Sequence, residues 1–164
     1  MKHCLSVLVE NKEGILARVA SLFGQRGFNI DSLTVSTTEN PDISRITIMT
    51  NGDKKTLIQI MKQTEKLIIT KLVLNIDIDD SILRELMLLK LKANEQELKE
   101  IKEIAGRYDA RLIDRTGSAV VIELTAEPDI IDSFYKEIEG SFKIIEMCRT
   151  GATAMEKGNI SYQF

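Results

Sequence analysis

Residues 5–35 constrain the fold most, because they contain a strand, a polar turn, a helix and the start of a second strand in direct succession. Leu5, Val7 and Val9 share one face of an extended chain, which predicts a strand with one strongly buried face. Apolar residues then recur at helical spacing from residue 15 to residue 23, and the next strand is predicted to open at Phe28. This order predicts a helix that packs on a sheet.

The polar turn before that helix has residue types suited to holding an anion. Backbone N–H groups of Gly14, Ile15 and Leu16 fall in the first helical turn, where they have no intrahelical acceptor and carry partial positive charge. Asn11 before the helix and Asn29 after it can each offer a donor and an acceptor to a zwitterion. A purely structural alternative stays open at this point, in which Asn11 only caps the helix and Asn29 only turns the chain.

The rest of the chain repeats one order of elements, β-α-β-β-α-β, twice. The first half continues with a strand at 43–50, a helix at 54–65 and a strand at 67–78. The second half is predicted to contain strands at 84–93, 109–114, 119–125 and 142–150, with helices at 95–107 and from residue 128 onward. The predicted fold is therefore α+β, with two tandem ferredoxin-like βαββαβ domains at residues 1–79 and 80–164.

Composition narrows the functional classes. With 164 residues, 43% apolar and 29% charged, the chain is typical of a globular protein. It has no apolar run long enough for a membrane helix and no signal peptide, so we expect a cytoplasmic protein with no membrane partner. Its net charge of −3 argues against a nucleic-acid surface.

Catalytic and metal-binding patterns are missing from the sequence. Cys4 and Cys148 lie in strand-like runs and are predicted to be reduced, buried thiols. His3 is the single histidine, and its neighbour on a strand points to the opposite face, so the two cannot form a thiolate–imidazole couple. No Cys/His cluster has metal-ligand spacing. We therefore expect no catalytic residue and no metal site.

Three motifs resemble one family. The run LSVLVENKEGILARVASLFGQRGFNIDSLTVSTTENPDISRITIMT resembles the amino-terminal ACT domain of the small, regulatory subunit of acetolactate synthase, also called acetohydroxyacid synthase. RELMLLKLKA and EMCRTGATAMEKG are similar to two segments of that family's carboxy-terminal domain. The pattern RGFNI-x-SLTV followed by ISR-x-TI is specific to this family rather than to ACT domains in general.

The resemblance implies a regulatory function. In that family the large catalytic subunit is a separate protein that carries thiamine diphosphate, magnesium and usually a flavin, FAD, so no cofactor is expected on this chain. The small subunit raises the activity of its partner and confers inhibition by branched-chain amino acids, chiefly valine. The resemblance also implies a homodimer through the ACT domains, in which Asn29 and Ile30 of the binding site come from the second protomer. The implied valine site consists of Asn11, Gly14, Ile15, Leu16, Asn29 and Ile30.

Two residues of the amino-terminal site depart from the family pattern, and two other functions are alternatives for this fold. Glu13 stands where many ACT domains have proline, and Ile15 is larger than its usual counterpart, which would narrow the pocket and favour valine. A free-standing amino-acid sensor is the alternative function. An RNA-recognition module would need stacking aromatics on its central strands, where this chain has Val7, Thr47 and Ile48.

Overall fold

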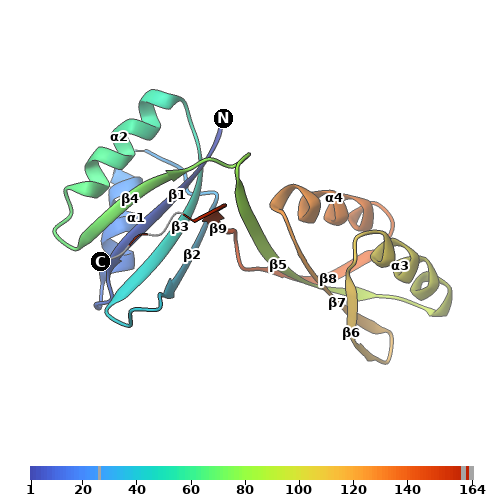
Figure 1. The fold of residues 1–164 in the computed structure, drawn as a ribbon. Helices are drawn as coiled ribbons and strands as arrows, with labels where there is room; N and C mark the ends of the chain where they lie inside the picture. Colours follow the sequence, from blue (N-terminus) through green and yellow to red (C-terminus); the bar gives the residue numbers. More distant parts are fainter. Residues whose placement is uncertain (26, 160–161, 163–164) are drawn as a thin grey trace. The chain divides into compact units, whose positions relative to one another are not determined.

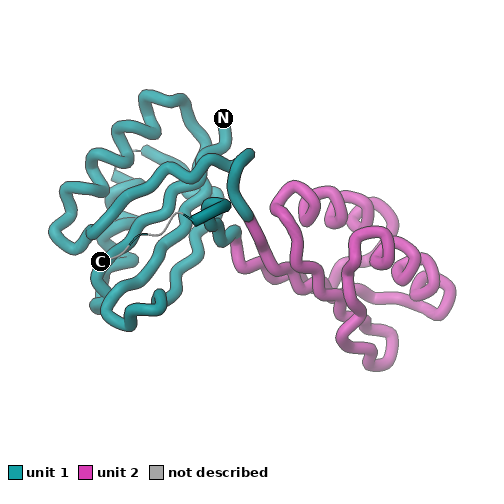
Figure 2. Tube along the Cα trace, in the orientation of Figure 1, with its two compact units in different colours: residues 1–82, 152–164 teal, residues 83–151 magenta. Residues whose placement is uncertain are grey.

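The chain forms two compact units, which Figure 2 shows in separate colours. The computed structural model describes residues 1–25, 27–159 and 162. Unit 1 consists of Met1–Ile82 and Ala152–Phe164, and unit 2 consists of Leu83–Gly151. Unit 2 is thus inserted into the chain of unit 1.

Unit 1 is a four-stranded antiparallel sheet with the strand order β2-β3-β1-β4. Its main elements are β1 (Lys2–Glu10), α1 (Ile15–Gln25), β2 (Ser32–Thr37), β3 (Ile43–Asn51), α2 (Lys54–Glu65) and β4 (Thr70–Ile76). Helices α1 and α2 cover one face of this sheet (Figure 1). The core between the helices and the sheet includes Leu5, Val7 and Val9 from β1, together with Phe23 from α1 and Ile60 from α2. The alternation that predicted β1 therefore marks its helix-covered face.

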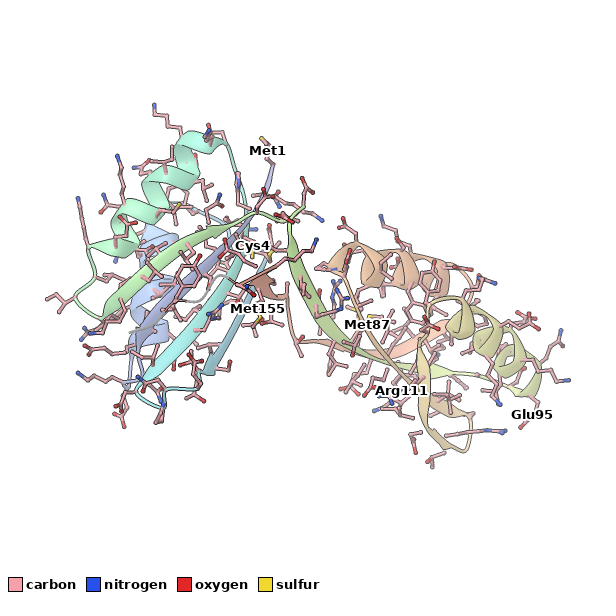
Figure 3. All side chains as sticks on the ribbon, in the orientation of Figure 1. Met1, Cys4, Met87, Glu95, Arg111 and Met155 are labelled. Atoms are coloured by element: carbon pink, nitrogen blue, oxygen red, sulfur yellow. The ribbon has the colours of Figure 1, made fainter. Side chains whose placement is uncertain are left out.

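Unit 2 repeats this arrangement with the strand order β6-β7-β5-β8. Its elements are β5 (Ser81–Lys92), α3 (Glu95–Arg107), β6 (Arg111–Thr116), β7 (Ala119–Ala126), α4 (Pro128–Glu139) and β8 (Lys143–Arg149). Met87 lies in the core between its sheet and its two helices (Figure 3). The two sheets have the same order of equivalent strands, which confirms the predicted tandem ferredoxin-like fold.

A short strand after unit 2 returns to unit 1, and the sequence did not predict it. This strand, β9 (Thr153–Glu156), pairs with β5, whose first two residues also belong to unit 1. The carbonyl of Ala152 accepts a hydrogen bond of 3.1 Å from the Thr34 hydroxyl on β2. The predicted domains placed all of residues 80–164 together, whereas the compact units return residues 152–164 to unit 1.

The return segment lies on the sheet face that α1 and α2 do not cover. Cys4, Ser6 and Leu8 alternate with the core residues of β1 and are also fully buried. Ala152 and Ala154 of the return segment are buried too, and β9 contacts β4. Burial on both faces explains why β1 is almost continuously apolar.

The predicted start of the second strand needs correction. Strand β2 begins at Ser32 rather than at Phe28, because the Phe28 N–H donates to the carbonyl of Phe23 (3.0 Å) and its ring packs edge-on against Phe23. Phe28 therefore closes α1 after Gly27, which has a φ of 70°.

None of the described helices is long and apolar enough to cross a membrane.

The two cysteines differ in environment, although both are free thiols. Cys4 is buried in unit 1 (Figure 3), and burial raises its pKa to about 11, so this thiol stays protonated at neutral pH. Cys148, however, is exposed, and the prediction of a buried thiol there is wrong. It lies on the edge strand β8 opposite Leu88, on the face of the sheet away from Met87 and the helices.

Candidate functional site

A cleft of about 540 Å³ opens in unit 1 beside the first turn of α1. It is bounded by the end of β1, the turn after it, α1, and residues of β2 and β3. Its lining residues are Val9, Glu10, Asn11, Lys12, Gly14, Ile15, Leu16, Ala17, Ala20, Val35, Ser44 and Ile46. Four of the six predicted site residues, Asn11, Gly14, Ile15 and Leu16, are therefore gathered in one cleft.

Gly14 shapes the entry into α1. Its φ of 75° is left-handed, a conformation that glycine adopts without strain. Its carbonyl accepts from the N–H of Arg18 (3.2 Å), so the first helical hydrogen bond begins here. The N–H groups of Gly14, Ile15 and Leu16 precede the first intrahelical donors and face the N-terminal end of the helix. This end carries the partial positive charge that favours a carboxylate.

The Asn11 side chain is bonded across the cleft to β3 and its preceding loop. Its Nδ2 donates to the carbonyl of Pro41 (2.9 Å), and its Oδ1 accepts from the Ser44 hydroxyl (3.1 Å). The Asn11 N–H also donates to the carbonyl of Asp42 (2.7 Å). The turn before α1 is thus tied at two points to the loop before β3 and at one point to β3 itself.

Apolar side chains form the wall of the cleft. Ile15 is only 6% exposed and belongs to the core with Val19 and Phe23, so most of its side chain faces inward. Leu16 and Val35 are 40% and 42% exposed, which leaves apolar surface available to a ligand. Ile46 lies opposite Val35 in the strand pairing and is fully buried.

A charged cluster borders the cleft. The Glu10 carboxylate pairs with the Lys12 ammonium at 2.6 Å and with the Lys71 ammonium at 2.7 Å. Hydrogen bonds from Lys12, then from Lys71, lower the pKa of Glu10 to about 2. Glu10 is therefore ionised at all physiological pH values and neutralises part of the positive charge beside the helix end.

Asn29 and Ile30 lie at the other end of α1 in the same chain. A helix of 11 residues spans about 16 Å, so these residues are not among those that line the cleft. The Asn29 carbonyl accepts from the Thr50 hydroxyl (2.6 Å), and its Nδ2 donates to Asp31 (2.8 Å). The prediction that a second protomer supplies these two residues stays a prediction.

Sequence reasoning missed the part of the cleft that comes from β2 and β3. Val35, Ser44 and Ile46 reach the turn through strand pairing, in which Ser44 lies opposite Val9 and Ile46 opposite Val7. One signal was present in the sequence: Ser44 occupies an apolar-face position in the alternation of residues 43–50. A hydroxyl at such a position indicates a polar partner on the buried face.

The fold and the cleft define a tandem ferredoxin-like protein whose first unit is of the ACT type. Residues 5–71 match the family described as the AHAS small subunit-like ACT domain. Residues 84–158 match the family described as the small subunit of acetolactate synthase. The two matches fall in unit 1 and largely in unit 2, respectively.

Similar proteins cover almost the whole chain. The probable acetolactate synthase small subunit of Archaeoglobus fulgidus is 45% identical over 159 residues, covering 97% of this chain and 99% of the relative. The isozyme 3 small subunit of Escherichia coli is 39% identical, covering 97% and 98%. The crystal structure of the Thermotoga maritima small subunit superposes with a TM-score of 0.88 at 36% identity, covering 98% and 99%. This chain belongs to the family of acetolactate synthase small subunits, which are regulatory subunits.

Proposed function

We propose that this chain binds valine in the cleft beside α1 and thereby regulates a separate, large catalytic subunit of acetolactate synthase. The chain itself catalyses nothing in this proposal. One observation carries the ligand assignment: a helix N-terminus, an oriented amide and apolar walls meet in a single cleft. These are the groups that a small zwitterion with a branched side chain needs.

Each part of the ligand has a partner of matching chemistry. The carboxylate is placed at the N–H groups of Gly14, Ile15 and Leu16, where donors and partial positive charge coincide. The ammonium group is placed at Asn11 Oδ1, which keeps a second lone pair beside the one bonded to Ser44. The branched side chain is placed against Leu16, where apolar surface is exposed.

A homodimer through the ACT units completes the proposed site. Asn29 and Ile30 of a second copy would add a further amide and a further apolar wall, giving two equivalent sites related by a two-fold axis. A ligand at such an interface can act on the partner enzyme, because small rotations of one unit on the other change contacts on both sides. Thiamine diphosphate, magnesium and FAD would be held by the catalytic subunit.

The proposal is tested by reconstitution with the large subunit encoded in the same genome. We expect the wild-type chain to raise acetolactate formation and to make it sensitive to valine. The variants Asn11→Ala and Asn29→His should keep the activation and lose much of the inhibition, because both side chains are assigned to the ligand and neither is assigned to the catalytic subunit. The measurements are the rate of acetolactate formation against valine concentration and complex formation by analytical ultracentrifugation.

Two outcomes would contradict the proposal. A wild-type chain that binds valine but forms no complex with the synthase would instead be a free-standing amino-acid sensor. A folded Asn29→His variant that loses activation together with inhibition would mean that ligand binding and activation use the same contacts.

The order of affinities among branched-chain amino acids is a separate prediction. An apolar pocket discriminates by roughly 1–3 kcal/mol per methylene, so valine and leucine should differ by about tenfold or more rather than absolutely. Ile15 lines the cleft on the side of α1 and is larger than its usual counterpart in the family that the sequence resembles, so we expect valine to bind more tightly than leucine. Direct calorimetric titration of both ligands measures the order, and tighter binding of leucine would overturn it.

A further inference from the structure

Ser44 is a polar residue on an otherwise apolar face. It is buried on β3, on the same face as Ile46 and Ile48, which belong to the core of unit 1. Its hydroxyl donates to Asn11 Oδ1 at 3.1 Å, and both residues line the cleft. The buried hydroxyl is therefore satisfied by the side chain to which the ammonium group of the ligand is assigned.

The Asn11 amide is held from both ends. The Pro41 carbonyl can only accept, so the nitrogen of the amide must face it, at 2.9 Å. The oxygen is then directed to Ser44, whose hydroxyl donates to it. Turning the amide over would break the hydrogen bond to Pro41 and set Oδ1 against its carbonyl, although the Ser44 hydroxyl could then accept from Nδ2. The polarity of the amide is thus fixed before any ligand arrives.

The fixed orientation of the Asn11 amide determines which charged group of a zwitterion can bind beside it. Oδ1 has two lone pairs, and Ser44 occupies one of them. The remaining lone pair accepts from an N–H donor, whereas it repels a carboxylate. The N-terminal N–H groups of α1 have the opposite preference. The cleft therefore has a hydrogen-bond acceptor, Asn11 Oδ1, on one side and the N–H donors of α1 on the other. An α-amino acid fits between them in one orientation.

We infer that Ser44 is a positioning residue that orients the Asn11 amide for the ammonium group of the bound amino acid. This inference rests on the proposed function and assigns a role to a residue outside the predicted site. Ser44 acts through Asn11, so its effect depends on the presence of Asn11. Pre-orientation of a polar group saves the free energy of ordering it when the ligand binds.

The test is a double-mutant cycle on the full chain, with valine as the ligand. Affinities are measured by chemical-shift titration of ¹⁵N-labelled protein, which remains usable at millimolar dissociation constants. Ser44→Ala should weaken valine binding about fivefold to tenfold, the effect of losing about one hydrogen bond. In the Asn11→Ala background, the same Ser44→Ala change should alter affinity by less than about twofold. Ser44→Thr keeps a hydroxyl and should stay near wild type.

The outcomes separate the inference from the proposed function. A wild-type chain that does not bind valine contradicts the proposed function, and the positioning role with it. Valine binding by the wild type with no loss in Ser44→Ala overturns the positioning role alone. An equal loss from Ser44→Ala in both backgrounds also overturns it, because the effect would then be general to the fold and independent of Asn11.

Discussion

Replacing Gly14 by aspartate should weaken valine binding about 100-fold or more. The new carboxylate would sit at the helix end to which the ligand carboxylate is assigned, and like-charge juxtaposition in a binding site costs several kcal/mol. The variant should remain folded, because a Cβ at Gly14 meets no atom within 4 Å and the cost is confined to the strain of a side chain at a φ of 75°. An acidic side chain at a helix N-terminus also stabilises the helix. Isothermal titration calorimetry with valine measures the effect.

Gly14→Asn is the matched control. Asparagine has nearly the same shape as aspartate, and both residues tolerate the left-handed backbone better than most, here at a φ of 75°. It carries no charge, so we expect its affinity to stay within about tenfold of wild type. Unchanged affinity in Gly14→Asp would show that the carboxylate binds elsewhere. An equal loss in both variants would point to backbone strain rather than to charge.

Replacing Arg149 by methionine should destabilise unit 2 by about 2–3 kcal/mol, less than the roughly 3–5 kcal/mol typical of a fully buried ion pair, because the Arg149 side chain is 28% exposed. Arg149 donates to both carboxylate oxygens of Glu85, at 2.7 and 2.8 Å, and to Asp132 on α4 at 2.7 Å. These hydrogen bonds, first those to Glu85, raise the pKa of Arg149. The Glu85 side chain is only 5% exposed, so the substitution would leave a buried carboxylate without its cation.

Hydrogen exchange of the β7 amides, followed by mass spectrometry, reports on unit 2 separately from unit 1. The control is Arg115→Met, which removes an ion pair with Glu95 whose side chains are 45% and 79% exposed. Exposed pairs contribute about 0–1 kcal/mol, so this control should hardly change protection. Equal loss of protection in the two variants would contradict a special role for Arg149. Combining Glu85→Leu with Arg149→Met should recover most of the stability.

Local signals in the sequence were sufficient for most of the elements. Asp53 caps α2 by accepting from the Thr56 N–H, and Asn94 forms a capping box with Glu97 at the start of α3. Pro128 occupies the first turn of α4. Such signals involve residues within one turn of each other, so periodicity and capping rules can read them without knowledge of the tertiary structure.

The strand β9 could not be predicted, because its stabilising contacts are with residues far away in the sequence. It has four residues, and its buried Ala154 is small and unremarkable in sequence. What fixes this segment is a set of contacts with residues far away in the chain, such as the hydrogen bond from Thr34 to Ala152. Short strands stabilised by distant partners carry little local pattern.

The candidate site divides in the same way. Asn11, Gly14 and Leu16 belong to one turn, so turn chemistry was enough to select them. Val35 and Ser44 join the cleft only through the pairing of β2 and β3 with the rest of the sheet. Pairing register is set jointly by the hydrophobic patterns of the paired strands and by the turns between them, so a motif within one turn does not reveal it.

The insertion of unit 2 affects how the protein is made. Strands β1 to β4 leave the ribosome early, but Ala152 and β9, which cover the Cys4 face of that sheet, follow only after Leu83–Gly151. At roughly 5–20 residues per second, the intervening segment of about 70 residues takes roughly 3–14 s to synthesise. For that time the nascent sheet has one face closed by helices, whereas the face that carries Cys4 and Leu8 lacks the segment that buries it. We therefore expect the nascent chain to be most prone to aggregation before Ala152 and β9 emerge.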